Sequence, residues 1–216
     1  MMIISVVNQK GGVGKTTIAI NVGIGMARMN YKVRFLDTDP QGTASKWQSI
    51  EGNIAFEVRH HPSPISSGDI VDTDGNHDLL VIDTPPAIGE ITLSVLKLSD
   101  LAIIPLAPSV LDIWSSSTTI EMIEEAKQVN PKLEGRLLVS RKIPRTRLAR
   151  EGREAIAALE MNMFGTEISQ RIAYIESMIA GVSVFQYAPK SEASKEIESL
   201  CQEIIHGTIQ TRQPGE

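Results

Sequence analysis

Short apolar runs recur along the chain and are separated by longer segments of mixed polarity. The run at residues 79–82, Leu-Leu-Val-Ile, is apolar at every position, as expected for a strand buried on both faces of a sheet. Runs of this kind predict strands at residues 3–7, 33–36, 54–58, 79–82, 101–104 and 136–140.

The segments between these runs have helical periodicity. In the first of them, Ile18, Val22, Met26 and Met29 follow one another at steps of three and four residues. The same criterion predicts helices at residues 15–30, 44–50, 115–129, 147–161, 172–180 and 192–206. Residues 62–76 are rich in Ser, Gly, Pro and Asp, and this composition predicts an irregular connection.

Strands that alternate with helices predict the α/β fold class: a mostly parallel twisted sheet flanked by helices, with right-handed crossovers. A length of 216 residues suits one domain, which we place at residues 1–206, followed by a polar C-terminal tail at 207–216. In such sheets, binding sites lie at the carboxyl ends of the strands. Polar residues that directly follow a predicted strand are therefore the candidates for function.

Composition narrows the function classes. A net charge of −5 argues against a fold that binds nucleic acid over its whole surface, so such binding would need a local basic patch. The single cysteine, Cys201, excludes an internal disulfide and fits a reducing compartment. The N-terminus lacks the features of a signal peptide, and no apolar run approaches about 18 residues. We therefore expect a cytoplasmic protein with no membrane segment.

The first predicted strand leads into a glycine-rich turn, and a helical pattern follows directly. The turn reads Lys10-Gly11-Gly12-Val13-Gly14-Lys15-Thr16-Thr17. Strand, glycine turn and helix are the context of a phosphate-binding loop, because glycines let main-chain N–H groups approach an anion and the helix N-terminus favours negative charge. Lys15 can reach the β- and γ-phosphates, and the Thr16 hydroxyl can bind Mg²⁺.

The loop departs from the ordinary pattern G-x-x-x-x-G-K-[ST]. Gln9 stands where that pattern begins with glycine, and Lys10 is an added lysine. The sequence here resembles the deviant Walker-A ATPases of the ParA/MinD type, whose pattern is K-G-G-x-G-K-[ST]. The resemblance implies a deviant Walker-A P-loop NTPase fold, an Mg²⁺-dependent ATPase, and ATP held by the loop from Lys10 to Thr17. It also implies that Lys10 reaches across a dimer interface to the nucleotide of the partner subunit.

Two carboxylates end the second predicted strand. The stretch Asp37-Thr38-Asp39-Pro40-Gln41 resembles the D-x-D-P-Q segment of the same family. The resemblance implies that Asp39 positions or polarises the attacking water and that Asp37 lies near the Mg²⁺ shell. Asp-Pro is also favourable turn chemistry on its own, which is the alternative interpretation.

Asp83 follows the apolar run at 79–82 and precedes Thr84-Pro85-Pro86. This is the arrangement of a Walker-B carboxylate, so Asp83 is predicted to hold Mg²⁺ through water. The resemblance implies that the segment after Asp83 senses the γ-phosphate. The alternative is a solvated aspartate at the end of a strand.

Weaker indications concern the nucleotide base. The proline-rich segment at 104–112 resembles that of the short plasmid-partition ATPases called ParF, where it lies near the nucleotide and helps to build the dimer; a stiffened loop is the alternative. Arg141 follows a predicted strand and is a candidate contact for the adenine or its ribose. By family analogy, Pro189 closes the other side of the base.

The resemblance places nucleic-acid contacts in the C-terminal third of the chain, at Arg171, Lys190 and Lys195. A denser group, called the basic cluster below, consists of Arg141, Lys142, Arg145, Arg147, Arg150 and Arg153. Its alternatives are a partner surface, a buried charge network and a solvated helix face. No aromatic residues are interleaved, so DNA contacts would be to phosphates and insensitive to sequence.

The resemblance extends from residue 3 to about residue 205 and favours a short ParA-type, ParF-like partition ATPase. It implies an ATP-dependent homodimer that binds DNA nonspecifically, is associated with the nucleoid, and has a centromere-binding partner protein that stimulates hydrolysis. One alternative is a MinD-like membrane-associated regulator, although the chain end at 207–216 is neither long nor basic enough for the amphipathic helix it would need. Another alternative is a metabolic ATP-dependent ligase on the same scaffold.

Overall fold

A computed structural model of the chain describes residues 1–51, 55–72, 75–87 and 89–209. In these ranges six strands form one sheet, in the order β3-β2-β4-β1-β5-β6. Every pairing between neighbours is parallel. The strands are β1 (Met2–Val6), β2 (Val33–Asp37), β3 (Val58–His60), β4 (Leu79–Asp83), β5 (Leu101–Leu106) and β6 (Glu134–Val139).

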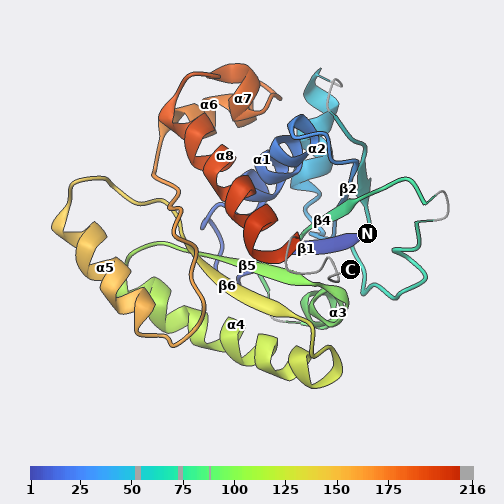
Figure 1. The fold of residues 1–216 in the computed structure, drawn as a ribbon, viewed down its shortest axis with the longest axis horizontal. Coiled ribbons are helices and arrows are strands. Elements are labelled where there is room, and N and C mark those ends of the chain that lie inside the picture. Colours follow the sequence, from blue (N-terminus) through green and yellow to red (C-terminus); the bar gives the residue numbers. More distant parts are fainter. Residues whose placement is uncertain (52–54, 73–74, 88, 210–216) are drawn as a thin grey trace, which may run out of the picture.

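Helices cover both faces of the sheet (Figure 1). One layer holds α3, α4 and α5, and the opposite layer holds α1, α6, α7 and α8. Their bounds are α1 (Lys15–Arg28), α2 (Thr43–Glu51), α3 (Glu90–Leu98), α4 (Val110–Val129), α5 (Arg147–Ala157), α6 (Ile172–Ile179), α7 (Val184–Tyr187) and α8 (Glu192–Ile204), with a π-helical turn η1 (Ile205–Ile209) at the end.

Alternate residues of each strand supply the two cores. In β4, Leu79 and Val81 belong to the apolar cluster that includes α1 and α8, whereas Leu80 and Ile82 belong to a cluster on the other face. A period of two directs neighbouring side chains to opposite faces of a sheet. Since both faces are covered, the fully apolar run is a buried central strand, as predicted.

Close approach of α8 to α1 depends on a glycine. A Cβ atom at Gly25 would lie 2.6 Å from Sγ of Cys201, which is buried on α8. Gly23, on the same helix, would place a Cβ atom 2.9 Å from the ring of Phe56. Glycines in a helix interior cost stability, and here they provide the space in which α8 and Phe56 pack on α1.

The predicted α/β class and parallel sheet are confirmed, but the short third strand was predicted wrongly. It lies at Val58–His60 and not at 54–58, and residue 54 is outside the described ranges. The ring of Phe56 stacks on Phe35 with centroids 5.4 Å apart. The chain bends at this buried aromatic residue, so pairing with β2 begins only at Val58.

Two helices, α3 and α7, were not predicted from the sequence. Ile91, Leu93 and Val95 alternate with polar residues, and this spacing concealed α3. Because β4 and β5 both pair in parallel with β1, the chain must cross back over the sheet between them, and α3 makes that crossover.

Several helix ends also differ from the prediction. Helix α4 begins at Val110, before the predicted residue 115, because Ser109 caps it by accepting a hydrogen bond from the N–H of Asp112 at 3.2 Å. Helix α5 ends at Ala157, short of the predicted residue 161. The predicted polar tail at 207–216 begins inside η1, and residues 210–216 are outside the described ranges.

Replacing Gly25 by Ala should lower the free energy of unfolding by about 1–3 kcal/mol, because the new methyl group overpacks against Cys201. The helix propensity of alanine acts in the opposite direction by at most about 1 kcal/mol. Urea unfolding measures the difference. Adding Cys201→Ala to the variant should recover part of the loss, whereas a Gly25→Ala protein as stable as the wild type would show that the two helices separate freely.

Candidate nucleotide-binding site

The ends of three neighbouring strands bring the predicted motifs together. Asp83 at the end of β4 is in register with Val6 of β1 on one side and with Asp37 of β2 on the other. The Thr38 hydroxyl donates a hydrogen bond to the carbonyl of Asp83 at 2.7 Å, and the Thr84 hydroxyl donates to the carbonyl of Val6 at 2.9 Å. The loops after these strands are thus fixed to one another at one edge of the sheet.

The glycine-rich turn has the shape of an anion-binding loop. Gly12 and Gly14 have φ angles of 76° and 93°, in the left-handed region that only glycine adopts easily. Helix α1 begins at Lys15 without a side-chain cap, so the N–H groups of its first turn are left for a ligand. A phosphate group would satisfy these donors and the positive end of the helix dipole.

Lys15 is buried, with 7% of the residue exposed, and its ammonium group donates to the carbonyl of Lys10 at 3.1 Å. Burial lowers the pKa of Lys15, while the nearby carboxylates of Asp83 and Asp39 act in the opposite direction. The structure therefore brings Lys15, Asp39 and Asp83, predicted from three separate motifs, into one electrostatic group.

The Asp83 side chain is fully buried, and neither carboxylate oxygen has a hydrogen-bond partner of regular geometry in the described ranges. Burial raises the pKa of Asp83 to about 7, with a smaller contribution of the same sign from Asp37, while the Thr16 hydroxyl and Lys15 act in the opposite direction. An unpartnered buried carboxylate beside a threonine hydroxyl fits Mg²⁺, which prefers oxygen ligands. The described ranges contain no group of three or more His, Cys, Asp or Glu side chains suited to a metal. A magnesium ion here would thus take further ligands from water and phosphate.

Asp37 and Asp39 are both buried, but their hydrogen bonds differ. Asp37 accepts from the N–H of Asp39 at 3.1 Å and from the N–H of Ser45 in the first turn of α2 at 3.1 Å. Asp39 accepts from the N–H of Gln41 at 2.8 Å through one carboxylate oxygen. Asp37 therefore shapes this loop, and the structure leaves its predicted role near the Mg²⁺ shell a prediction.

Lys10 is held by α4. Its ammonium group lies 2.6 Å from a carboxylate oxygen of Asp112, and the two side chains are 38% and 11% exposed. The preceding residue, Gln9, donates its side-chain amide to the carbonyl of Ser115, and its main-chain N–H donates to the hydroxyl oxygen of Thr119 at 3.3 Å. The first half of the loop is thus attached to α4, while its second half becomes α1.

A cavity of about 200 Å³ adjoins the loop. Arg141, predicted to contact the base, lines it and donates to the carbonyl of Gly12 at 2.6 Å. Pro189 is not among the lining residues, so the structure does not bring it to this cavity. The full lining consists of Gly12, Val13, Gly14, Thr17, Ile18, Ser140, Arg141, Ile168, Ser169, Gln170, Arg171, Tyr174 and Ile175.

One wall of the site was not predicted from the sequence. Residues 168–175 contribute to it, carry no motif and reach the loop only through the fold. Asp112 belongs to the segment 104–112 that was predicted to lie near the nucleotide, but its pairing with Lys10 was not predicted; Ser109, three residues before it, caps the helix that places it beside the loop.

The residues predicted to contact DNA are mostly engaged within the chain. Arg171 is 2.7 Å from a carboxylate oxygen of Glu196, and this hydrogen bond raises the pKa of the guanidinium group. Lys195 pairs with Glu192 at 2.8 Å on the surface of α8. Lys190 is exposed and has no ion pair in the described ranges. A role of these residues in DNA binding stays a prediction. The structure shows a different role for Arg171, which pairs with Glu196 within the chain.

The matches to known proteins agree with this site. The family described as "CobQ/CobB/MinD/ParA nucleotide binding domain" matches residues 4–184. The chain is 34% identical over 209 residues to "Maintenance of carboxysome distribution protein A" of Halothiobacillus neapolitanus, covering 94% of this chain and 95% of that one. It is 27% identical over 237 residues to "Chromosome-partitioning ATPase Soj" of Thermus thermophilus, covering 94% of each.

Among solved structures, cobyrinic acid a,c-diamide synthase from Mycobacterium smegmatis with a bound ATP analog and magnesium superimposes with a TM-score of 0.76. Its identity to this chain is 19%, over 99% of this chain and 98% of that one. The chain belongs to the CobQ/CobB/MinD/ParA nucleotide-binding family, so the predicted ParA/MinD relationship and P-loop fold are confirmed. That synthase structure contains an ATP analog and magnesium, which correspond to the ligands predicted for this chain. In the described ranges, no helix combines the length and hydrophobicity that a bilayer crossing requires.

Replacing Asp83 by Asn should stabilise the protein at about pH 8 in the absence of Mg²⁺ and nucleotide. The folded-state pKa of about 7 lies above the ordinary value of 3.8, so the folded protein keeps a proton that the unfolded chain loses between these values. The free energy of unfolding of the wild type therefore falls as pH rises from about 4 to about 7, and asparagine removes this dependence. Thermal unfolding of wild type and variant in EDTA, at about pH 5 and about pH 8, measures this pH dependence.

The variant should exceed the wild type in melting temperature by more at the higher pH than at the lower one. Adding ATP and Mg²⁺ should stabilise the wild type and do so much less in the variant, because the carboxylate is gone. An equal pH dependence of the two proteins would mean that Asp83 is ionised throughout.

Proposed function

We propose that this chain is a ParA-type ATPase, which dimerises with ATP, binds DNA nonspecifically and hydrolyses ATP when a cargo-bound partner protein stimulates it. The observation that carries the proposal is the pair of lysines in one loop. Lys15 points into the site, and Lys10 lies at the surface with 38% of its side chain exposed. DNA segregation, the function predicted from the sequence, is the case of this proposal in which the cargo is a replicon.

The geometry supports a role for each polar group. The N–H groups that follow Gly14 and the Lys15 ammonium group bind the phosphates. Thr16 and Asp83 would hold Mg²⁺, which offsets phosphate charge when bound. Asp39 is close enough to Lys15 to affect its pKa, and in this position it orients the attacking water. Burial of these groups excludes other water from the reacting phosphate.

Lys10 supplies the link between dimerisation and hydrolysis. In the single chain its charge is balanced by Asp112, outside the group formed by Lys15, Asp39 and Asp83. A second subunit facing the loop would offer phosphate charge to the same ammonium group. A cation supplied in trans stabilises the transferred phosphoryl group as an arginine finger does, so hydrolysis would require the dimer.

A second candidate for the cargo is a protein compartment in place of a replicon. The relative with 34% identity is named for carboxysome distribution, and the relative with 27% identity for chromosome partitioning. The same ATPase cycle serves either cargo, because the partner protein connects the dimer to the cargo. The membrane-associated and ligase alternatives lack a comparable observation among the described residues.

Lys10→Ala should bind ATP with nearly wild-type affinity but form no ATP-dependent dimers, because Lys15 and the loop N–H groups remain while the cation for the partner's nucleotide is lost. Light scattering with ATP and Mg²⁺ measures the dimer, and calorimetry the binding. Asp39→Ala is the matched control: it should dimerise and stay dimeric, with hydrolysis slowed by about tenfold or more. Lys15→Ala should fail to bind ATP. If the Lys10→Ala protein dimerised with ATP as well as the wild type does, the proposed role of Lys10 at the interface would be wrong.

Deleting the gene for this chain in its host should distinguish the two cargoes. Loss of a replicon with cells otherwise normal supports DNA segregation, and clustering of protein compartments with stable replicons supports the second candidate. Plasmid retention assays and electron microscopy provide the two measurements. Complementation by Asp39→Ala should fail in either case, because the cycle needs hydrolysis.

A further inference from the structure

We propose that residues 143–150, called the α5 arm, form the surface that contacts the phosphates of duplex DNA. The arm comprises the loop after β6 and the first turn of α5. The inference rests on the DNA binding proposed above, and it names the surface responsible, which differs from the C-terminal residues predicted from the sequence.

The structure divides the basic cluster into neutralised and free charges. Lys142 and Arg153 both pair with Glu167, the latter at 2.5 Å. Arg141 is engaged by the carbonyl of Gly12 at 2.6 Å. These three therefore serve the fold and the nucleotide loop, which leaves the arm as the part of the cluster with unsatisfied charge.

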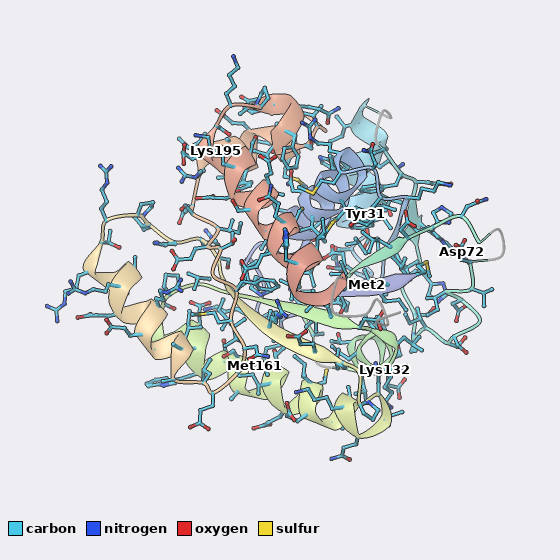
Figure 2. The ribbon with its side chains drawn as sticks, viewed as in Figure 1. Met2, Tyr31, Asp72, Lys132, Met161 and Lys195 are labelled. Atoms are coloured by element: carbon cyan, nitrogen blue, oxygen red, sulfur yellow. The ribbon has the colours of Figure 1, made fainter. Side chains whose placement is uncertain are left out.

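The arm presents three arginines to solvent. Arg145 and Arg150 are exposed and have no ion-pair partner in the described ranges. Arg147 is 81% exposed and pairs only with Glu151 on the same helix, an exposed ion pair that is worth little and gives way readily to another anion. Arg145 also holds a φ angle of 63°, an unfavourable conformation for a residue with a side chain. In Figure 2, side chains ending in nitrogen project from the α5 end of the molecule into solvent.

On a chain with a net charge of −5, three neighbouring exposed arginines, two of them without an ion-pair partner in the described ranges, are complementary to a polyanion. The apolar face of α5 argues against a membrane surface, because Ala149, Gly152 and Ile156 are buried against the protein. Only Ile143 and Leu148 remain as exposed large apolar residues of the arm. That is too little apolar surface for insertion into lipid, whereas phosphate contacts need only the cations.

The residues of the C-terminal third are less suited to this role. Arg171 is occupied by Glu196, which also accepts from the Tyr174 hydroxyl at 3.1 Å, so releasing the arginine would disrupt a network beside the nucleotide cavity. Lys195, labelled in Figure 2 on α8 and apart from α5, is paired with Glu192. Of the three residues predicted there, Lys190 alone has no ion pair in the described part of the chain, and one cation gives weak binding to DNA.

The arm is also mechanically connected to the nucleotide loop. A Cβ atom at Gly152 would lie 2.4 Å from Cβ of Pro108, so α5 sits directly on this proline. Pro108 precedes Ser109, the cap of α4, and Asp112 in the first turn of α4 holds Lys10. Transfer of Lys10 to a partner's phosphates would remove the ion-pair partner of Asp112, which lies four residues after the proline on which α5 packs. DNA binding by the arm is therefore expected with ATP and absent with ADP.

The test compares three double variants of the full chain with ATP and Mg²⁺: Arg145→Ala/Arg150→Ala in the arm, Lys190→Ala/Lys195→Ala in the C-terminal third, and Lys32→Ala/Lys132→Ala at exposed lysines elsewhere. All three remove two positive charges. Binding to random-sequence linear duplex DNA is measured by fluorescence anisotropy over a range of salt concentrations. Light scattering, ATP affinity and melting temperature show that each variant is folded and dimerises.

The arm variant should lose DNA affinity by about tenfold or more on every sequence, with the slope of log affinity against log salt reduced by about 0.9 for each phosphate contact removed. The two other variants should bind as the wild type does. Loss of binding in the C-terminal variant, with none in the arm variant, overturns the proposal while leaving the proposed function intact. A wild-type dimer that binds no DNA overturns the DNA part of the proposed function and this inference together.

Vesicles of phosphatidylserine and phosphatidylcholine provide the last comparison. Binding of the wild type to these vesicles, lost in the arm variant while DNA binding is unchanged, would make the arm a lipid surface and overturn the proposal. No vesicle binding, together with DNA binding lost in the arm variant, supports it.

Discussion

The ammonium group of Lys15 is buried, and the rest of the site is arranged around its charge. An isolated buried cation is costly, and its burial does lower its pKa. Asp39 and Asp83 offset part of this cost from two neighbouring strand ends, which requires β2 and β4 to end at the same height beside the loop. These carboxylates supply only part of the negative charge that Lys15 needs, because the pKa of Asp83 is about 7. A bound phosphate would add to it.

The two lysines of the loop differ in environment although only four residues separate Lys10 from Lys15. Lys15 is fixed by burial at the first position of α1, whereas Lys10 lies on the side of the loop attached to α4. The carbonyl of Lys10 accepts from Lys15, so the main chain of one lysine is fixed by the side chain of the other. A movement of α4 therefore changes the position of Lys10 and the hydrogen bond of Lys15 at once.

Features encoded within a few neighbouring residues could be predicted from the sequence. The loop, Asp83 and the central strands depend on glycine conformation, burial and period, all of which are local. Contacts between distant segments could not: the pairing of Lys10 with Asp112 and of Arg171 with Glu196 depends on where the fold places α4 and α8. Helix α3 was missed because its alternating apolar residues match the pattern of a strand. The need for a helix becomes clear only from the sheet, in which β4 and β5 both pair in parallel with β1 and a crossover must connect them.

The contact between Gly25 and Cys201 bears on how the protein is made. Strand β1 is central in the sheet and α1 lies on it, yet α1 is covered by α8, the last long helix in the described ranges. A ribosome that has delivered only the first half of the chain has therefore exposed an apolar helix face with nothing to pack on it. The face of α1 that α8 covers therefore stays exposed until the C-terminal segment has been made, and exposed apolar surface of this kind is prone to aggregation.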